Sequence, residues 1–243
     1  MTYVWRVEDL LKLGMANAES YRRAAPFPHA CFDNFLTDEV IDRILAEFPA
    51  PDSGYWSTKN RPDTIKQDTT PGLGTELKMP PAIREMMWQL NSSAFLIFLR
   101  HLTGIAGLVP DPYLFGGGIH QILPGGLLKI HADFNIHEII GLYRRINVLI
   151  YLNRDWKPEY GGNIELWSRD MTRREKSFEP IAGRCIIFNT DDDSYHGHPD
   201  PLTCPPGTSR KSIAMYYYTA APPPRGSQTP HNTLWQRRPG EQY

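Results

Sequence analysis

The stretch from residue 113 to residue 219 decides the fold, because it consists of short runs that are rich in β-branched and aromatic residues. Turn formers such as Gly161-Gly162 separate these runs. Runs of this length and composition predict β-strands. The six runs are YLFGGGIHQIL (113–123), LLKIHAD (127–133), RINVLIYLN (145–153), NIELW (163–167), RCIIF (184–188) and RKSIAMYYYT (210–219).

Helical periodicity precedes this β-rich part. Apolar residues recur at helical spacing over residues 7–18 and 40–48, and Thr37 is placed to cap the second of these helices. A third helical block follows Pro80 and Pro81 and extends to about Leu102, where it is predicted to pack on the outer face of the β-core. Residues 26–36 are strand-like, whereas residues 49–80 are broken by glycine and proline and predict a long irregular loop.

Many short strands after helices favour a β-sandwich or jelly roll that is buttressed by N-terminal helices. We therefore expect a single, mostly β domain over residues 1–243. Its helical part would cover residues 1–112, its jelly-roll core residues 113–220, and its tail residues 221–243. The tail is polar and rich in proline, but Leu234 and Trp235 could dock on the body.

Composition narrows the classes of function. The formal net charge is −1, which gives no electrostatic case for binding nucleic acid or an anionic membrane surface. No apolar run approaches the roughly 20 residues of a membrane span, and no secretory signal pattern opens the chain, so we expect a cytoplasmic protein. Its three cysteines fit no disulfide or zinc pattern and are expected to be reduced. The sequence does not determine the oligomeric state.

The motif KIHADFN (129–135) carries the chemistry. His131 and Asp133 lie two residues apart at the end of a strand, so their side chains share one face. A further histidine is available in SYHGHPD (194–200). Two imidazoles and one carboxylate are the ligands of an open-sided non-haem Fe(II) site. The spacing does not decide between His196 and His198, because residues two apart on a strand also share a face.

The last predicted strand adds a possible anion site. Alternation places Arg210 and Ser212 on one face, and a guanidinium beside a hydroxyl forms a fork for a carboxylate. An arginine that faces a barrel interior needs a buried anion. Asn147 and Tyr151 share a face of their own strand and would reach the same pocket.

Alternation also places one residue of a neighbouring pair in that pocket. His120 and Gln121 lie one strand before the HxD motif, and one of them must point inward. The pattern alone does not say which.

These motifs, together with INVLIYLN and the glycine turn that follows it, resemble the 2-oxoglutarate- and Fe(II)-dependent oxygenases, in particular the prolyl-4-hydroxylase-like branch. The resemblance covers roughly residues 26–219. It implies a double-stranded β-helix core, and it implies Fe(II), 2-oxoglutarate and O2 as cofactors. The residues that it assigns are His131, Asp133 and His196 as metal ligands and catalytic residues, and Arg210, Ser212, Tyr151, Asn147 and Gln121 as co-substrate residues.

The implied reaction is hydroxylation of an unactivated C–H bond, coupled to conversion of 2-oxoglutarate into succinate and CO2. Halogenating relatives replace the carboxylate ligand, which is present here as Asp133. Two irregular segments, Tyr55–Gly74 and Phe134–Arg144, are predicted to cover the pocket mouth as lids. Their basic residues favour a small carboxylate-bearing substrate, although solvated surface charge explains them about as well. The basic residues concerned are Lys59, Arg61, Lys66, Arg144 and Arg145.

Three other functions compete with this hypothesis. The same core could hydroxylate a peptide, as a prolyl-type hydroxylase does. A cupin-like zinc or nickel enzyme could use the same ligands, but it would not need the arginine and serine fork. A catalytically silent ligand-binding jelly roll is the non-enzyme alternative. Succinate formation that depends on Fe(II) and 2-oxoglutarate would separate an oxygenase from the last two.

Overall fold

The computed structural model describes residues 3–69 and 74–241. Its helices are α1 (Val7–Arg23), α2 (Asp38–Ala46), η1 (Thr75–Lys78), α3 (Pro81–Leu90), α4 (Ser93–Thr103) and η2 (Pro158–Tyr160), of which η1 and η2 are short 3-10 turns. Its strands are β1 (His29–Phe32), β2 (Trp56–Arg61), β3 (Thr64–Thr69), β4 (Val109–Pro110), β5 (Gly118–Ile122), β6 (Leu127–Ala132), β7 (Tyr143–Tyr151), β8 (Ile164–Trp167), β9 (Arg174–Phe178), β10 (Cys185–Asn189), β11 (His196–His198), β12 (Arg210–Thr219) and β13 (Leu234–Trp235).

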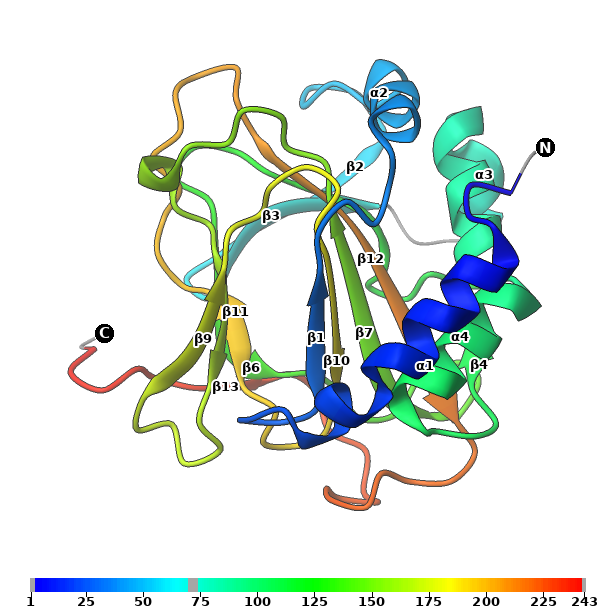
Figure 1. Cartoon of the computed structure of the whole chain (residues 1–243). Helices are drawn as coiled ribbons and strands as arrows, with labels where there is room; N and C mark the ends of the chain where they lie inside the picture. The colour runs from blue at the N-terminus through cyan, green and yellow to red at the C-terminus, as the bar shows by residue number, and fades with distance from the viewer. Residues whose placement is uncertain (1–2, 70–73, 242–243) are drawn as a thin grey trace.

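These strands form one curled antiparallel sheet (Figure 1). Its order is β1-β10-β7-β12-β5-β3-β6-β11-β8-β9, with β2, β4 and β13 added at β3, β12 and β6. The sheet curls so that β6 and β11 lie apart from β1, β10 and β7 in Figure 1. This arrangement confirms the predicted mostly β fold with a double-stranded β-helix (jelly-roll) core and N-terminal helices.

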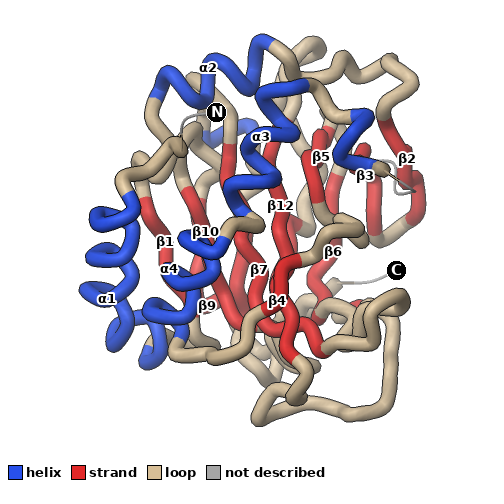
Figure 2. The backbone as a smooth tube through the Cα atoms, turned by 90° about the vertical axis from the view of Figure 1, so that its right-hand side faces the viewer, coloured by secondary structure: helices blue, strands red, loops and turns tan. Residues whose placement is uncertain are grey.

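The two faces of β12 show how the sequence pattern makes the core. Ile213, Met215 and Tyr217 are fully buried in the main apolar cluster, together with side chains from the helices. Figure 2 shows the helices packed along this side of the sheet. The alternate residues of β12, among them Arg210 and Ser212, face the interior cavity. The alternation thus leaves an apolar outer face for the helices and a polar inner face for the site.

The helices follow the predicted caps, with one exception. Thr37 accepts a hydrogen bond from the backbone N–H of Val40 at the start of α2. The predicted long helix to Leu102 is wrong, because the chain breaks at Ser92, which instead caps α4 by accepting from the N–H of Phe95. The break changes which side of the second helix faces the core. Ile97, which a single continuous helix was expected to bury, is therefore 43% exposed. Among the described residues, no helix is long and apolar enough to cross a membrane.

The predicted loop over residues 49–80 is also wrong in its central part. Strands β2 and β3 form a hairpin around Pro62-Asp63, with Arg61 paired to Thr64. Strand β3 then pairs with both β5 and β6, so the hairpin belongs to the main sheet. Residues 70–73 of the predicted loop lie outside the described ranges.

The tail returns to the body as predicted for Leu234 and Trp235. Strand β13 pairs with β6, so that Leu234 lies opposite Ala132 and Trp235 opposite His131. The indole of Trp235 lies 5.1 Å from the His131 ring, centroid to centroid. The tail therefore reaches the HxD motif.

Candidate active site

Three predicted ligand residues converge inside the curled sheet. His131 and His196 lie directly opposite each other on β6 and β11, with ring centroids 4.5 Å apart. Asp133 follows β6, and its two carboxylate oxygens lie 3.6 Å from His131 Nε2 and 3.4 Å from His196 Nε2. One donor atom from each residue lies within 4.8 Å of the other two. The structure therefore brings together the set that the sequence proposed, and their role as metal ligands stays a prediction.

Backbone contacts orient both histidine rings. His131 Nδ1 lies 2.8 Å from the carbonyl oxygen of Lys129, and His196 Nδ1 lies 2.9 Å from that of Ser194. A carbonyl oxygen only accepts, so each Nδ1 carries the hydrogen and each Nε2 presents a lone pair. Burial lowers the pKa of His196 to about 4, which keeps this ring neutral. Two imidazole nitrogens and a carboxylate are a donor set that fits a divalent metal ion.

Two residues of β7 hold Asp133 from the other side. Arg144 Nη2 lies 3.0 Å from Asp133 Oδ2, and Asn147 Nδ2 donates to the same oxygen at 2.8 Å. Arg144 also donates twice to Asn147 Oδ1 and stacks 3.5 Å from the centroid of the Tyr216 ring. Burial raises the pKa of the Asp133 carboxyl, but the positive charge of Arg144 opposes this effect, and the pKa lies well below its usual range.

The contact made by Arg144 corrects one prediction. Asn147 lines the cavity, as predicted, and its amide nitrogen also donates to the candidate metal ligand Asp133, so its role toward the co-substrate stays a prediction. Arg144 was expected on a mobile insert at the mouth, whereas its side chain is only 2% exposed. The cause is a β-bulge: Tyr217 pairs with Ile146 but Tyr218 pairs with Arg144, so Arg145 is an extra residue and Arg144 turns inward.

Arg210 also lines the cavity and is held by two contacts. Its Nε donates to the carbonyl oxygen of Gly162 at 2.7 Å, and its Nη2 donates to the Tyr151 hydroxyl at 3.2 Å. Gly162 has a φ of +73°, and a Cβ there would lie 2.9 Å from Arg210 Cδ, so only glycine fits. Tyr151 is fully buried and does not line the cavity, so it reaches the pocket through Arg210. Arg210 and Ser212 both line the cavity, as predicted.

The register of the sheet decides between His120 and Gln121. His120 lies opposite Ser212 on β12, whereas Gln121 lies opposite Lys211. Residues that are directly opposite in an antiparallel pair share a face, so His120 points inward with Ser212. Gln121 turns away and hydrogen-bonds to Gln67 and Ser209. The assignment of Gln121 to the pocket is therefore wrong, and His120 lines the cavity in its place.

His198 also lines the cavity, two residues after His196 on β11. The intervening Gly197 is required, because a Cβ there would lie 2.7 Å from the carbonyl oxygen of Lys129 on the neighbouring strand. His198 lies opposite Leu128 rather than opposite a candidate ligand. This position agrees with its predicted place outside the metal triad.

The cavity has a volume of about 760 Å³ and is walled by segments from distant parts of the chain. The β2–β3 hairpin provides one wall. The predicted lid over Tyr55–Gly74 is therefore corrected to a pair of strands within the sheet. The second predicted lid, Phe134–Arg144, is anchored as well, since His137 is fully buried and its Nε2 lies 3.2 Å from Asp111.

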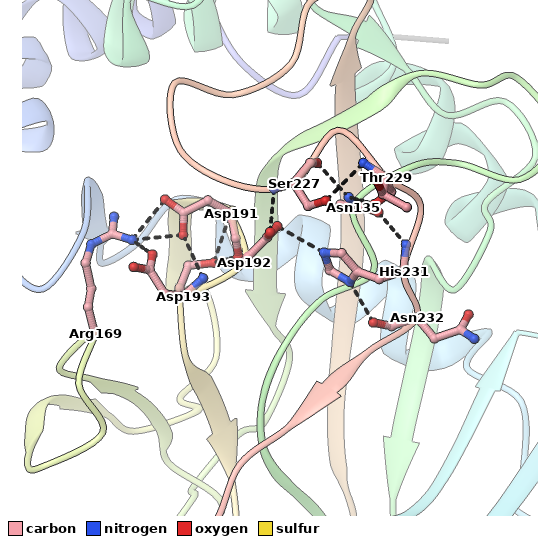
Figure 3. A network of polar contacts seen from close by, with 10 residues as sticks. Asn135, Arg169, Asp191, Asp192, Asp193, Ser227, Thr229, His231 and Asn232 are labelled. Atoms are coloured by element: carbon pink, nitrogen blue, oxygen red, sulfur yellow. Dashed lines mark hydrogen bonds and ion pairs between the residues drawn. The ribbon is translucent and has the colours of Figure 1, made fainter.

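A C-terminal strap, defined here as residues 227–235, forms another wall of the cavity. Figure 3 shows the polar contacts that hold this strap. Asn135 donates to the carbonyl oxygens of Ser227 and Thr229 and accepts from the N–H of His231, all at 2.9 Å. Asp192 accepts from the N–H of Ser227, and its carboxylate lies 3.0 Å from His231 Nε2. The sequence predicted the docking of Trp235, but it held no sign of the part played by Asn135.

Residues 117–218 match the family model described as the 2OG-Fe(II) oxygenase superfamily. Over these residues the chain is similar to this superfamily. Within this matched region lie β5 to β11, all of β12 except Thr219, the three candidate ligands and the Arg210 fork.

Solved structures agree with this oxygenase fold. A prolyl-4-hydroxylase from Pseudomonas putida is 16% identical, with a TM-score of 0.61 over 85% of this chain and 99% of that one. A Trichoplax adhaerens prolyl hydroxylase, solved with a peptide fragment of the hypoxia inducible factor oxygen degradation domain, is 17% identical, with a TM-score of 0.65 over 90% and 94%. HygX from Streptomyces hygroscopicus, solved with nickel, 2-oxoglutarate and hygromycin B, is 14% identical, with a TM-score of 0.51 over 79% and 82%. The chain thus shares its fold both with a protein solved with a peptide and with a protein solved with a small molecule.

The enzyme is accordingly a 2-oxoglutarate-dependent dioxygenase that uses Fe(II), 2-oxoglutarate and O2. Iron in such a site supplies the redox chemistry that oxidises 2-oxoglutarate and a substrate C–H bond. Lys129, Ser194 and Asn147 orient the candidate ligands His131, His196 and Asp133, which lie inside the cavity.

Proposed function

We propose that this enzyme hydroxylates an unactivated C–H bond of a small, carboxylate-bearing molecule, with release of succinate and CO2. In this proposal His131, Asp133 and His196 hold Fe(II), and Arg210 and Ser212 hold the distal carboxylate of 2-oxoglutarate. Arg144 and Asn147 position the Asp133 carboxylate, while the cavity walls bind the substrate and exclude water.

The observation that carries this proposal is a surplus of basic side chains around the cavity. The charged residues that line it are Lys59, Arg61, Lys66, Arg144 and Arg210 against Asp68, Asp133 and Glu138. Counting histidines as neutral, this is a net charge of about +2. Fe(II) and the 2-oxoglutarate dianion carry equal and opposite charges, so binding both leaves the surplus unchanged. An anionic substrate would neutralise it.

Lys66 is the best-placed contributor to this surplus. Its side chain is 10% exposed, and its ammonium lies 3.3 Å from Asp68. Lys59 lies 2.6 Å from the same carboxylate oxygen, so one anion serves two ammonium groups. Burial lowers the pKa of the Lys66 ammonium, which is the effect expected of a cation with too little counter-charge. A substrate carboxylate beside Lys66 would supply the missing charge.

The size and enclosure of the cavity favour a small molecule over an extended peptide. A volume of about 760 Å³ suits a co-substrate together with a second small ligand. The strap also narrows the opening, since Pro230, Asn232 and Thr233 line the cavity in addition to Trp235. A peptide would have to pass this strap or displace it.

The test compares matched acids and neutral analogues. Candidate carboxylic acids, their amides, and a proline-containing peptide are incubated with the purified enzyme, Fe(II) and 2-oxoglutarate, and succinate and a product 16 mass units heavier are measured. We expect acids to stimulate coupled turnover and the corresponding amides to do so at least tenfold less. Equal turnover of acid and amide, or coupled turnover of the peptide alone, would contradict the proposal.

Two lysine variants test whether Lys66 binds the carboxylate of the substrate. Lys66→Met should raise the KM for an active acid about tenfold or more, while the KM for the co-substrate stays close to wild type. Lys176→Met is the matched control, because Lys176 is exposed on β9 and does not line the cavity. If Lys66→Met raised only the KM for the co-substrate, Lys66 would belong to the co-substrate site instead.

A further inference from the structure

His198 differs from the other histidines of the cavity in having no internal partner. Among the described residues, neither His198 Nδ1 nor His198 Nε2 has a hydrogen-bond partner, although the residue is only 3% exposed. By contrast, a ring nitrogen of each of His120, His131 and His196 lies within 3.0 Å of a carbonyl oxygen. Leaving buried polar atoms unpaired opposes folding, so two on one ring call for an explanation.

The position of His198 points to the co-substrate end of the cavity. It follows the candidate ligand His196 by two residues on β11, so both side chains face the cavity. Burial first, and then the positive charges of Arg210 and Lys66, hold the pKa of His198 well below its usual range, so the ring is neutral. A neutral imidazole is not attracted to the neighbouring cations. Its N–H group can, however, donate to the same anion that these cations bind.

The contacts of Arg210 leave room for another donor. Two of its five N–H groups are already used, by the Gly162 carbonyl and the Tyr151 hydroxyl. A carboxylate accepts about four hydrogen bonds. A planar guanidinium presents at most two of its N–H groups to one carboxylate, and the Ser212 hydroxyl adds one donor, so about one acceptor position of the carboxylate stays open for His198.

We propose that His198 is a further 2-oxoglutarate-binding residue, and that its ring N–H donates to the distal carboxylate that Arg210 and Ser212 also bind. An imidazole carries at least one N–H, so this contact needs no change of its protonation. The inference rests on the proposed Arg210 fork and is independent of the substrate.

The test measures binding under nitrogen, without turnover or substrate. The Fe(II)-loaded enzyme is titrated with 2-oxoglutarate and, separately, with pyruvate, and complex formation is followed by the visible charge-transfer absorbance and by calorimetry. Pyruvate keeps the 2-oxo acid group but lacks the distal carboxylate. His198→Leu should weaken 2-oxoglutarate binding about tenfold or more and leave pyruvate binding within twofold of wild type. His198→Asn, which keeps an N–H donor, should recover part of the loss.

The thermal stability of the His198→Leu protein distinguishes a role of His198 in co-substrate binding from a role in the fold. Since leucine removes two unpaired polar atoms, the ligand-free His198→Leu protein should melt no lower than wild type, while its stabilisation by 2-oxoglutarate shrinks. Unchanged 2-oxoglutarate affinity would overturn the proposal, as would an equal loss for pyruvate, which would mean that His198 acts on the metal end.

Arg210→Leu in the same titration distinguishes the two hypotheses. If it weakens 2-oxoglutarate binding while His198→Leu does not, the fork stands and the inference about His198 fails. If neither change has an effect, the fork itself is wrong.

Discussion

Replacing Arg144 with glutamine tests whether its buried ion pair stabilises the fold at the expense of metal binding. The two side chains of the Arg144–Asp133 pair are 2% and 11% exposed, and their closest atoms are 3.0 Å apart. At an effective dielectric constant of 20 the direct attraction is about 5 kcal/mol. Removing one partner of such a pair costs about 3–5 kcal/mol, because the other charge stays buried. For a chain of this length we therefore expect the melting temperature to fall by about 6–20 °C.

The assay is thermal unfolding of the metal-free protein followed by circular dichroism. Arg173→Gln is the matched control, since the Arg173 side chain is 70% exposed and pairs with Glu175 on the surface. A surface pair contributes about 0–1 kcal/mol, so the control should shift the midpoint by less than about 4 °C.

A second arm adds Fe(II) under nitrogen. Arg144 and a metal ion would share the carboxylate of Asp133, so each should weaken the binding of the other. Fe(II) should therefore raise the melting temperature of Arg144→Gln by more than it raises that of wild type. Two results would refute this reasoning: an Arg144→Gln protein that melts like the control, or an equal rise with Fe(II) in both proteins.

The remaining predictions concern the candidate ligand, the co-substrate fork and the strap. Asp133→Asn should abolish Fe(II)-dependent succinate formation, and wild-type turnover would remove Asp133 from the metal site. Arg210→Leu should raise the apparent KM for the co-substrate about 30- to 5,000-fold, since a buried charged contact is worth about 2–5 kcal/mol; an unchanged KM would mean that another basic residue binds the co-substrate. Asn135→Ala removes three hydrogen bonds of about 0.5–1.5 kcal/mol each. Amide hydrogen exchange over residues 227–235 should then accelerate and 2-oxoglutarate consumption should uncouple from product formation, while unchanged exchange would show that the strap is held by other contacts.

The six runs of residues 113–219 predicted β5, β6, β7, β8, β10 and β12, because period-two alternation is a local property, but they missed β9 and β11. On β12 the alternation correctly separated Arg210 and Ser212 from the apolar residues that pack against the helices. The hairpin of β2 and β3 was missed because glycine and proline dominate its surroundings. Its signal was the Pro62-Asp63 turn, which favours a two-residue reversal between short polar strands.

The errors inside the site have a different cause. Whether His120 or Gln121 faces inward depends on the register between β5 and β12, and the sequence of one strand alone does not determine that register. Arg144 faces Asp133 because of a bulge in β7, and no residue type marks that bulge. The sequence could thus predict which residue types gather in the pocket, but a single-residue shift in pairing decided which of them point inward.

The strap has a consequence for the nascent chain. Trp235 is synthesised about one hundred residues after His131, the residue that it faces, and about forty residues after His196. At about 5–20 residues per second, the ribosome therefore produces all three candidate iron ligands seconds before the segment that closes the pocket. During this interval β6 lacks its β13 neighbour and presents an unpaired edge. A chain that acquires iron at this stage would hold it in a pocket open to water and O2, so iron loading is best timed after residue 235 has left the ribosome.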